Sequence, residues 1–267
     1  MNTVGAGLAW DFTPDPGASV LIRGDLFVLV YDHPLCNGRL RSMGETPALR
    51  IDGLRFAYGT GGPAVVDVGS LVLAPGEQML LTGGSGRGKS TLLMLIAGLM
   101  EPNAGRVVVD GQVVHDLHGA RRDLFRGRAI GMIFQTFNLL HGFSALENVM
   151  AALMFSTVPR VEHRERAGTL LQRLGVERVN ARPEELSVGQ QQRVAVARAV
   201  ACGPALVLAD EPTASLDPEN AANAMDLIQH ACRDAGAALL CVSHDPSMAE
   251  RFERRASWDE LSAAVRT

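Results

Sequence analysis

Gly83-Gly84-Ser85-Gly86-Arg87-Gly88-Lys89-Ser90-Thr91 is the stretch around which the chain is organised. Apolar residues precede it at 79–81 and follow it at 92–97, which predicts a strand, a glycine loop and a helix. Its pattern G-x-x-x-x-G-K-S is complete and, in that context, is typical of a phosphate-binding loop. Glycines let the backbone curl until successive N–H groups point inward, and the helix adds its N-terminal amides to the same point. The stretch therefore predicts a site for the phosphates of a nucleotide.

The polar side chains of this loop have separate expected roles. Lys89 brings a positive charge to the β- and γ-phosphates, and the Ser90 hydroxyl is placed to ligate Mg²⁺. The alternative is a glycine-rich turn with an incidental lysine, which the flanking strand and helix disfavour. The expected nucleotide-binding residues of the loop are Gly83, Gly84, Ser85, Gly86, Arg87, Gly88, Lys89, Ser90 and Thr91.

The composition narrows the class of protein. A chain of 267 residues is long enough for one α/β domain and an appendage. Its residues are 47% hydrophobic but only 5% aromatic, as buried parallel strands and their helices prefer. A net charge of −4 argues against a general nucleic-acid binder, which usually has a basic surface. The four cysteines form no C-x-x-C pair, which favours a reducing cytoplasm, and no apolar run reaches the ~18 residues of a membrane span.

Residues 1–46 differ from the rest of the chain. Residues 1–19 are rich in Gly, Ala and Pro, and the apolar run at 20–31 is interrupted by Arg23 and Asp25. No basic region precedes that run, so a signal peptide is not expected. One interpretation is a short added hairpin. We favour a second one, in which Met43 is the true start and residues 1–42 are a misassigned or disordered extension, because the domain at 47–267 needs nothing from them.

Strand and helix patterns alternate from residue 47 onward. Pro75-Gly76 and Asp110-Gly111 mark turns, the second inside a hairpin, and Ser144-Ala145-Leu146-Glu147 is a capping box. Expected strands lie at 49–51, 54–56, 65–68, 70–73, 79–81, 106–109, 112–114, 130–134, 206–209 and 238–242. Expected helices lie at 92–100, 144–155, 159–174, 187–202, 217–235 and 259–265. The alternation predicts a mostly parallel sheet with helices on both faces and a helical lobe at about 135–203.

Ligands of such sheets bind at the carboxyl ends of the strands. Lys89, Asp210 and His244 each follow an apolar strand, so they are expected to meet at one crevice. Asp210 is suited to hold Mg²⁺ through water, opposite Ser90, and Glu211 to accept a proton from an attacking water or to orient it. The alternative for the two acids is a cap on a strand-to-loop turn.

Further motifs, in order along the chain, resemble those of the ABC-type ATPases. Leu186-Ser187-Val188-Gly189-Gln190-Gln191-Gln192-Arg193 is similar to the signature motif of that family, and it lies a short helix before the acidic strand. Gln135 matches the Q-loop, Ser215-Leu216-Asp217 the D-loop and His244 the switch histidine. Tyr58 matches the aromatic residue that stacks on adenine. The resemblance covers roughly residues 47–245, and the ordered combination is far more specific than any single motif.

The resemblance implies a P-loop NTPase core, an antiparallel β subdomain and a helical lobe, and an ATPase that uses ATP and Mg²⁺. Two such domains face head to tail, so that ATP on one P-loop is covered by the signature of the other. Catalytic roles fall to Glu211, His244 and Lys89. The implied metal site is formed by Ser90, Gln135 and Asp210, the signature contact in trans by Ser187, Val188, Gly189 and Gln190, and the D-loop by Ser215 and Asp217.

Each of these residues also has an ordinary structural interpretation. His244 is then a polar residue after a strand, Gln135 a turn residue and Tyr58 a core aromatic at a strand end. Arg193 is expected to support the signature helix rather than to touch ATP.

The region after the Q-loop is the most informative about the branch of the family. Phe134-Gln135-Thr136-Phe137-Asn138-Leu139-Leu140, followed by Ala145-Leu146-Glu147-Asn148-Val149, resembles the lipoprotein-releasing and macrolide-exporting ATPases, with the bacterial cell-division ATPase close by. This implies a peripheral motor at the cytoplasmic face of the inner membrane, whose Q-loop surface receives a helix of a permease subunit on a separate chain. Alternatively, Phe137, Leu139 and Leu140 simply pack the helical lobe.

Two other functions are alternatives to a transporter motor. A regulatory ATPase of the cell-division type would act on a membrane partner without moving cargo. A soluble ABC-type ATPase of DNA repair or translation would generally carry a coiled-coil or zinc insertion or a second ATPase domain. This chain has one P-loop, one signature and no heptad run, which disfavours that class.

Val188 departs from the family motif, which usually has glycine there, and its branched Cβ stiffens the backbone. We expect activity to survive, because Ser187 and Gly189, which make the implied phosphate contacts, are retained. The test is the ATPase turnover of Val188→Gly. A rise by orders of magnitude would show that the native site is impaired.

Overall fold

The computed structural model describes residues 18–23, 26–31, 46–59, 61–214 and 216–263. The chain divides into two compact units, Met1–Met43 and Gly44–Thr267. In the first, β1 (Ala18–Arg23) and β2 (Leu26–Tyr31) form an antiparallel pair in which Ala18 lies opposite Tyr31. The expectation that Met43 is the true start stays a prediction.

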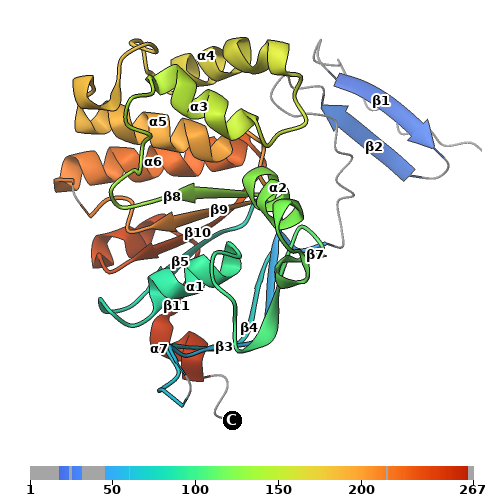
Figure 1. The fold of residues 1–267 in the computed structure, drawn as a ribbon, viewed down its shortest axis with the longest axis vertical. Helices are drawn as coiled ribbons and strands as arrows, with labels where there is room; N and C mark the ends of the chain where they lie inside the picture. Colours follow the sequence, from blue (N-terminus) through green and yellow to red (C-terminus); the bar gives the residue numbers. More distant parts are fainter. Residues whose placement is uncertain (1–17, 24–25, 32–45, 60, 215, 264–267) are drawn as a thin grey trace, which may run out of the picture. The chain divides into compact units, whose positions relative to one another are not determined.

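The second unit is built on a five-stranded parallel sheet in the order β11-β5-β10-β9-β8 (Figure 1). The parallel sheet expected from the alternating pattern is therefore confirmed. Its strands are β5 (Gln78–Thr82), β8 (Ile130–Ile133), β9 (Leu206–Asp210), β10 (Ala238–Ser243) and β11 (Arg254–Ser257).

Alternate residues of these strands enter two separate cores, as the period of a strand requires. On one face, residues such as Leu239 and Cys241 pack with the helical lobe. On the other face, Ala238, Leu240 and Val242 pack with the P-loop helix and the antiparallel sheet. Because both faces are covered, β8, β9 and β10 are almost entirely apolar, which is why they were visible as continuous runs, whereas the edge strand β11 is polar.

A four-stranded antiparallel sheet, in the order β4-β3-β6-β7, lies on the second core. Its strands are β3 (Leu49–Phe56), β4 (Val66–Leu73), β6 (Ala104–Val109) and β7 (Gln112–Val113). The expected hairpin at 106–114 is confirmed, with Asp110 and Gly111 both at positive φ in its turn. The two short strands expected at 49–51 and 54–56 form the single strand β3, and those expected at 65–68 and 70–73 form the single strand β4. A bulge interrupts the β3–β6 register between Asp52 and Arg55.

The helices agree with most of the expected ranges. They are α1 (Lys89–Ile96), α2 (Ala120–Ala129), α3 (Ala145–Leu153), α4 (His163–Arg173), α5 (Val188–Val200), α6 (Pro218–Asp234) and α7 (Trp258–Ala263). Short 3-10 turns occupy Val114–Asp116, Arg160–Glu162, Pro183–Glu185 and Pro246–Arg251. Among the described residues, no helix is long and apolar enough to cross a membrane.

Three details differ from expectation. The P-loop helix ends at Ile96 instead of near Met100, because Gly98 adopts a left-handed conformation and its N–H returns to the Leu95 carbonyl. The sequence did not predict α2, whose four arginines obscure any apolar period. Nor did it predict β11, a short polar segment that is a strand only because it pairs with β5.

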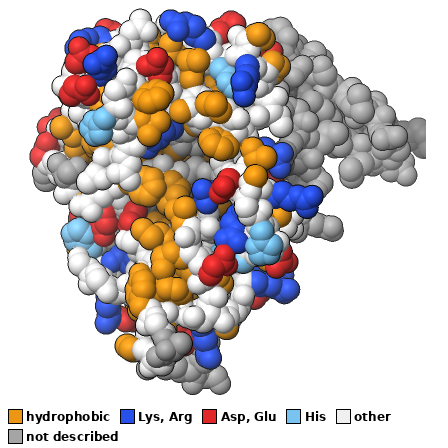
Figure 2. Space-filling view, in the orientation of Figure 1, with side chains coloured by type: hydrophobic (Ala, Val, Ile, Leu, Met, Phe, Trp, Pro, Cys, Tyr) orange, Lys and Arg blue, Asp and Glu red, His pale blue; other side chains and the backbone are white. Residues whose placement is uncertain are grey.

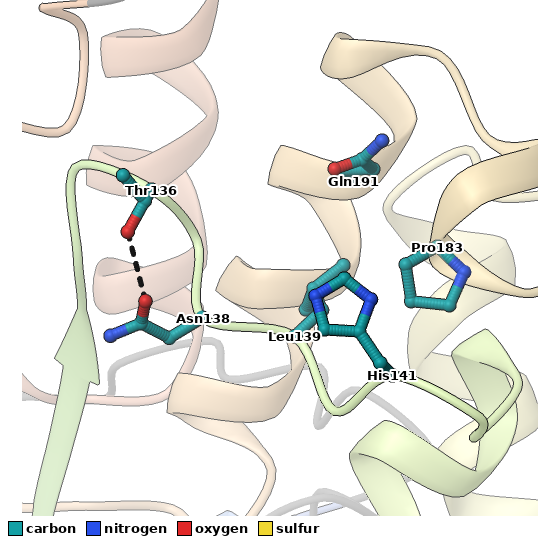
Figure 3. A pocket seen from close by; sticks show the side chains of 6 residues that line it. All are labelled: Thr136, Asn138, Leu139, His141, Pro183 and Gln191. Atoms are coloured by element: carbon teal, nitrogen blue, oxygen red, sulfur yellow. Dashed lines mark hydrogen bonds between the residues drawn. The ribbon is translucent and has the colours of Figure 1, made fainter.

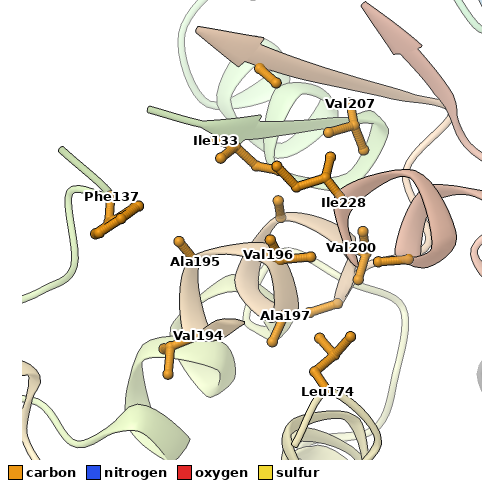
Figure 4. Close-up of a cluster of buried hydrophobic side chains, with 14 of the residues drawn as sticks. Ile133, Phe137, Leu174, Val194, Ala195, Val196, Ala197, Val200, Val207 and Ile228 are labelled. Atoms are coloured by element: carbon orange, nitrogen blue, oxygen red, sulfur yellow. The ribbon is translucent and has the colours of Figure 1, made fainter. Parts of the chain in front are cut away.

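The helical lobe packs α3, α4 and α5 on one another and on the sheet. Figure 4 shows Val196 and Val200 of α5 near Ile133 and Val207 of the strands, with Ile228 of α6 beside them. The expected capping box of Ser144 with Glu147 is formed, and the expected cap Ser187 also forms a capping box with Gln190.

Asn148, fully buried on α3, ties the loop after the Q-loop to the lobe. Its Oδ1 accepts from the Leu140 N–H at 2.8 Å, and its Nδ2 donates to the carbonyls of Leu140, Phe143 and Ser144. The side chain therefore satisfies backbone groups that would otherwise be buried without partners.

We expect Asn148→Leu to lower the free energy of unfolding by about 2–4 kcal/mol, because it leaves those backbone groups unsatisfied. Urea unfolding followed by circular dichroism measures the change. The matched control is Asn220→Ala, an exposed residue of α6, for which we expect a loss under about 1 kcal/mol. Equal losses in the two variants would contradict the role given to Asn148.

Candidate functional site

The phosphate loop leaves β5 and turns directly into α1. Gly86 and Gly88 have φ of 73° and 100°, which a side chain would resist. Lys89 is only 5% exposed, and its Nζ donates to the carbonyl oxygens of Gly83 at 2.7 Å and Gly84 at 2.8 Å. The ammonium group therefore lies across the mouth of the loop, where it offers a positive charge to an anion.

Three adjacent strands end at the same edge as this loop. In the sheet register, Val242 of β10 lies opposite Leu81 of β5 and opposite Asp210 of β9. The strands that precede Lys89 and His244 and the strand that ends at Asp210 are therefore neighbours in one sheet, as their expected meeting at one crevice requires, although Lys89 and Asp210 lie 121 positions apart in the chain.

Asp210 is the most electrostatically unusual acid at this edge. Burial raises the pKa of its carboxyl; hydrogen bonding from the Ser90 hydroxyl and the charge of Lys89 offset part of that rise, and the charge of Glu211 adds to it. Its Oδ1 is buried and has no hydrogen-bond partner among the described residues. A buried, unsatisfied carboxylate oxygen beside a serine hydroxyl is a donor set that suits a hard divalent cation.

Glu211 and His244 form a pair at the same edge. Glu211 Oε2 lies 2.9 Å from His244 Nδ1 and accepts from the His244 backbone N–H at 3.3 Å. Glu211 has a positive φ of 46°, and its own N–H donates to the Val242 carbonyl at 3.0 Å. Non-glycine residues in this conformation are uncommon and gather at functional sites. The strand-end register thus holds a carboxylate and an imidazole in contact.

Tyr58 is 61% exposed, so it is not the core aromatic of the structural alternative. Its ring lies edge-on to Phe56, with centroids 4.9 Å apart, and its hydroxyl is 3.4 Å from Thr91 Oγ1. An exposed ring face beside the start of α1 is available to a planar group, and stacking on adenine stays a prediction.

The Q-loop follows β8. Gln135 is exposed, and Phe137 and Asn138 have positive φ values of 58° and 45°. The Arg198 guanidinium of α5 donates to the carbonyls of Phe137 and Asn138 at 2.7 and 2.6 Å, which holds the loop on the lobe. Phe137 and Leu139 are buried in the lobe core, as in the packing alternative, whereas Leu140 is exposed.

The signature residues form the exposed start of α5. Ser187 Oγ accepts from the Gln190 N–H at 3.3 Å, and Gln190 Oε1 accepts from the Ser187 N–H at 3.1 Å. Val188 is exposed, and a Cβ placed on Gly189 would meet nothing within 4 Å. Arg193 donates to the Leu174 carbonyl at 2.6 Å, which confirms its structural role.

Two residues missed at the sequence level support these motifs. Gln192 is buried, and its Nε2 donates to the Pro212 carbonyl at 3.2 Å, which joins α5 to the loop after Glu211. Trp258 of α7 packs against Gly83 and Gly88. Trp258 reaches the loop because β11 pairs with β5, and no local sequence pattern predicts that pairing.

Of the expected D-loop residues, Ser215 lies outside the described residues. Asp217 caps α6: its Oδ1 accepts from the Asn220 N–H at 3.1 Å and its Oδ2 from Asn220 Nδ2 at 2.6 Å. These bonds lower the pKa of the Asp217 carboxyl.

A family model and two relatives of similar sequence point to the same family of proteins. The ABC transporter family model matches residues 66–214. A lipoprotein-releasing system ATP-binding protein, LolD, of Maricaulis maris is 44% identical over 210 residues, which cover 77% of this chain and 91% of the relative. The macrolide export ATP-binding/permease protein MacB of Syntrophobacter fumaroxidans is 44% identical over 188 residues, which cover 69% of this chain and 26% of that protein.

A solved structure has the same fold. The dimeric post-hydrolysis state of the ATP-binding cassette MJ0796, bound to ADP and Pi, superposes with a TM-score of 0.69 at 34% identity, over 78% of this chain and 93% of the other. The P-loop, the acidic strand end and the signature helix described above lie within the matched family region. The chain therefore belongs to the ABC transporter family, as an ATPase subunit that binds and hydrolyses ATP.

Proposed function

We propose that this subunit is the motor of a membrane transporter of the lipoprotein-release or macrolide-export type, and that it hydrolyses ATP with Mg²⁺ between two head-to-tail copies. The observation that carries the chemistry is the single sheet edge at which the phosphate loop, Asp210 and the Glu211–His244 pair meet. The relatives named above support the type of transporter.

The residues that would hold Mg²⁺ are Ser90, Asp210 and Gln135. Asp210 offers its unsatisfied Oδ1, and Ser90 already lies beside that carboxyl. The described residues contain no cluster of three or more His, Cys, Asp or Glu side chains that could hold a metal ion. We therefore expect nucleotide phosphate oxygens to complete the coordination, and the bound ion to neutralise phosphate charge.

Glu211 is the proposed general base, which orients and deprotonates the attacking water. Its partner His244 points Nδ1 at Glu211, so its Nε2 faces away from that carboxylate and is directed to charge that develops on the γ-phosphate. Lys89 supplies the fixed positive charge at the β- and γ-phosphates, and Tyr58 the stacking surface for adenine.

The second copy completes the site in this proposal. Gly189 has open space where a Cβ would stand, so its own fold does not demand glycine. A glycine at an exposed helix start is suited instead to close approach of an external anion to the backbone. Ser187, Val188, Gly189 and Gln190 would thus cover the ATP held by the P-loop of the partner copy, and the dimeric state of MJ0796 supports this arrangement.

The proposed partner is a permease subunit on a separate chain, which places this subunit at the cytoplasmic face of the membrane. A hollow of about 410 Å³ beside the Q-loop is lined by Thr136, Asn138, Leu139, His141, Pro183 and Gln191 (Figure 3). Leu140 and Phe143, close to these residues in the sequence, are exposed. In the view of Figure 2, apolar side chains form a band down the middle of the second unit, with charged side chains beside it. A mixed hollow with an apolar border suits an amphipathic helix.

Glu211→Gln should cut ATP turnover by on the order of 10²–10⁴, because the amide cannot accept the proton of the attacking water. It should also trap an ATP-bound dimer. Phosphate release and size-exclusion chromatography with ATP measure the two effects. The control is Glu253→Gln, an exposed acid outside the site, which should leave both unchanged. Normal turnover in the Glu211 variant would show that the assigned base is wrong.

The membrane partner is tested by purifying the tagged protein from mild-detergent membranes and identifying co-purifying chains by mass spectrometry. Leu140→Asp should reduce the yield of partner about tenfold, which corresponds to roughly 1.4 kcal/mol of lost contact. Leu140 is 43% exposed, and the control Val72→Asp, on the antiparallel sheet, is 41% exposed.

A co-purifying membrane subunit with a path for cargo would support the proposal that this chain is the motor of a transporter. A membrane partner without such a path would favour the cell-division type of ATPase instead. Recovery only from the soluble fraction, with nucleic acid or ribosomes, would overturn the transporter while leaving the ATPase chemistry standing.

A further inference from the structure

The strand β11 places one residue directly beside the phosphate loop. It runs parallel to β5, with Arg254 opposite Met79 and Ser257 opposite Thr82. The residue after each strand follows the same register, so Trp258 comes beside Gly83 at the point where the loop begins. Trp258 and Gly83 are neighbours because their strands pair, although they lie 175 positions apart in the chain.

The Trp258 side chain lies close to both ends of the loop, with its Cβ nearest to Gly83 and its indole ring next to Gly88. A Cβ added to Gly83 would lie 2.8 Å from the Trp258 Cβ, and one added to Gly88 would lie 3.3 Å from the indole Cζ2. The Val65 carbonyl oxygen borders the same position of Gly88, 2.5 Å from the added Cβ. Trp258 is itself 6% exposed. The Gly88 end of the phosphate loop therefore packs against both the indole and the residue before β4.

The structure also holds Trp258 in place. In α7, the Ser257 N–H donates to Glu260 Oε2 at 2.8 Å and the Glu260 N–H to Ser257 Oγ at 3.2 Å, which is a closed capping box. Asp259 pairs with Arg87 at the tip of the loop, but both side chains are more than half exposed, so this ion pair contributes little. Besides the hydrogen bonds from Lys89 to the Gly83 and Gly84 carbonyls, the loop is therefore restrained by its packing against Trp258.

We propose that Trp258 is a positioning residue for nucleotide binding, which keeps the glycine loop in the conformation that receives phosphate. A loop with four glycines has many accessible backbone conformations, and ordering it costs free energy. When only a fraction of molecules holds the competent loop, the apparent Kd rises by the inverse of that fraction. The inference rests on nucleotide binding at residues 83–91 and goes beyond the residues that touch the nucleotide.

Trp258→Ala should raise the Kd of ADP about tenfold, as expected if roughly one loop in ten stays competent. Turnover at saturating ATP should stay within about twofold, because the residue acts before chemistry. Trp258→Phe, which keeps a ring against the glycines, should restore most of the affinity. Calorimetry measures the Kd of ADP, and phosphate release at saturating ATP measures the turnover.

The matched control is Leu261→Ala, a buried residue of the same helix and the same core, whose atoms are not among the nearest neighbours of a Cβ added to Gly83 or Gly88. It should lower thermal stability and leave the Kd of ADP unchanged. Equal changes of Kd in the Trp258→Ala and Leu261→Ala variants, or no change in either, would overturn the proposal. Failure of the native protein to bind ADP would instead overturn nucleotide binding at the loop.

A second measurement does not depend on the folding of a Trp258 variant. The chain has two tryptophans, so Trp10→Phe leaves Trp258 as the single emitter. ADP should then change the emission of Trp258 in a saturable way, with the same Kd that calorimetry gives. Emission that stays unchanged while calorimetry shows ADP binding would contradict the proposed contact with the loop.

Discussion

The parallel register of β5, β10 and β9 is the constraint on which the site depends. Leu81, Val242 and Asp210 lie in one row, so the residues that follow these strands emerge side by side. Burial of alternate strand residues in two different cores sets this register. A slip by one residue would move every side chain of a strand into the opposite core, where its size and shape would not match the packing. The contact between Glu211 and His244 therefore rests on hydrophobic packing on both faces of the sheet.

Helix α5 connects the parts of the protein that ATP and a membrane partner would use. Its start carries the signature residues, and Gln192, one turn later, donates to the Pro212 carbonyl beyond Glu211. Arg198, near its end, holds the carbonyls of Phe137 and Asn138 in the Q-loop. One helix therefore contacts the Q-loop, carries the signature residues and reaches the loop after the acidic strand end.

Features encoded within a few residues were predictable from sequence. The P-loop, the Ser144–Glu147 capping box, the Ser187 cap and the Asp110-Gly111 hairpin each depend on local backbone conformation and on near neighbours in the chain. Features that depend on distant neighbours were missed or left open. The arginine-rich α2, the polar strand β11 and the burial of Phe137 and Leu139 follow from what packs against them, because propensity and periodicity are weak where tertiary contacts decide.

The sequence by itself determined the chemistry of this protein, because the types and order of its phosphate-binding, acidic and signature residues require no knowledge of distances. The tertiary structure decided the environment of those residues. It buried Asp210 with one unsatisfied oxygen, brought Glu211 within 2.9 Å of His244 and set Trp258 against the ends of the phosphate loop. These contacts join strands far apart in the chain, and only the register of the folded sheet, fixed by packing on its two faces, brings them together.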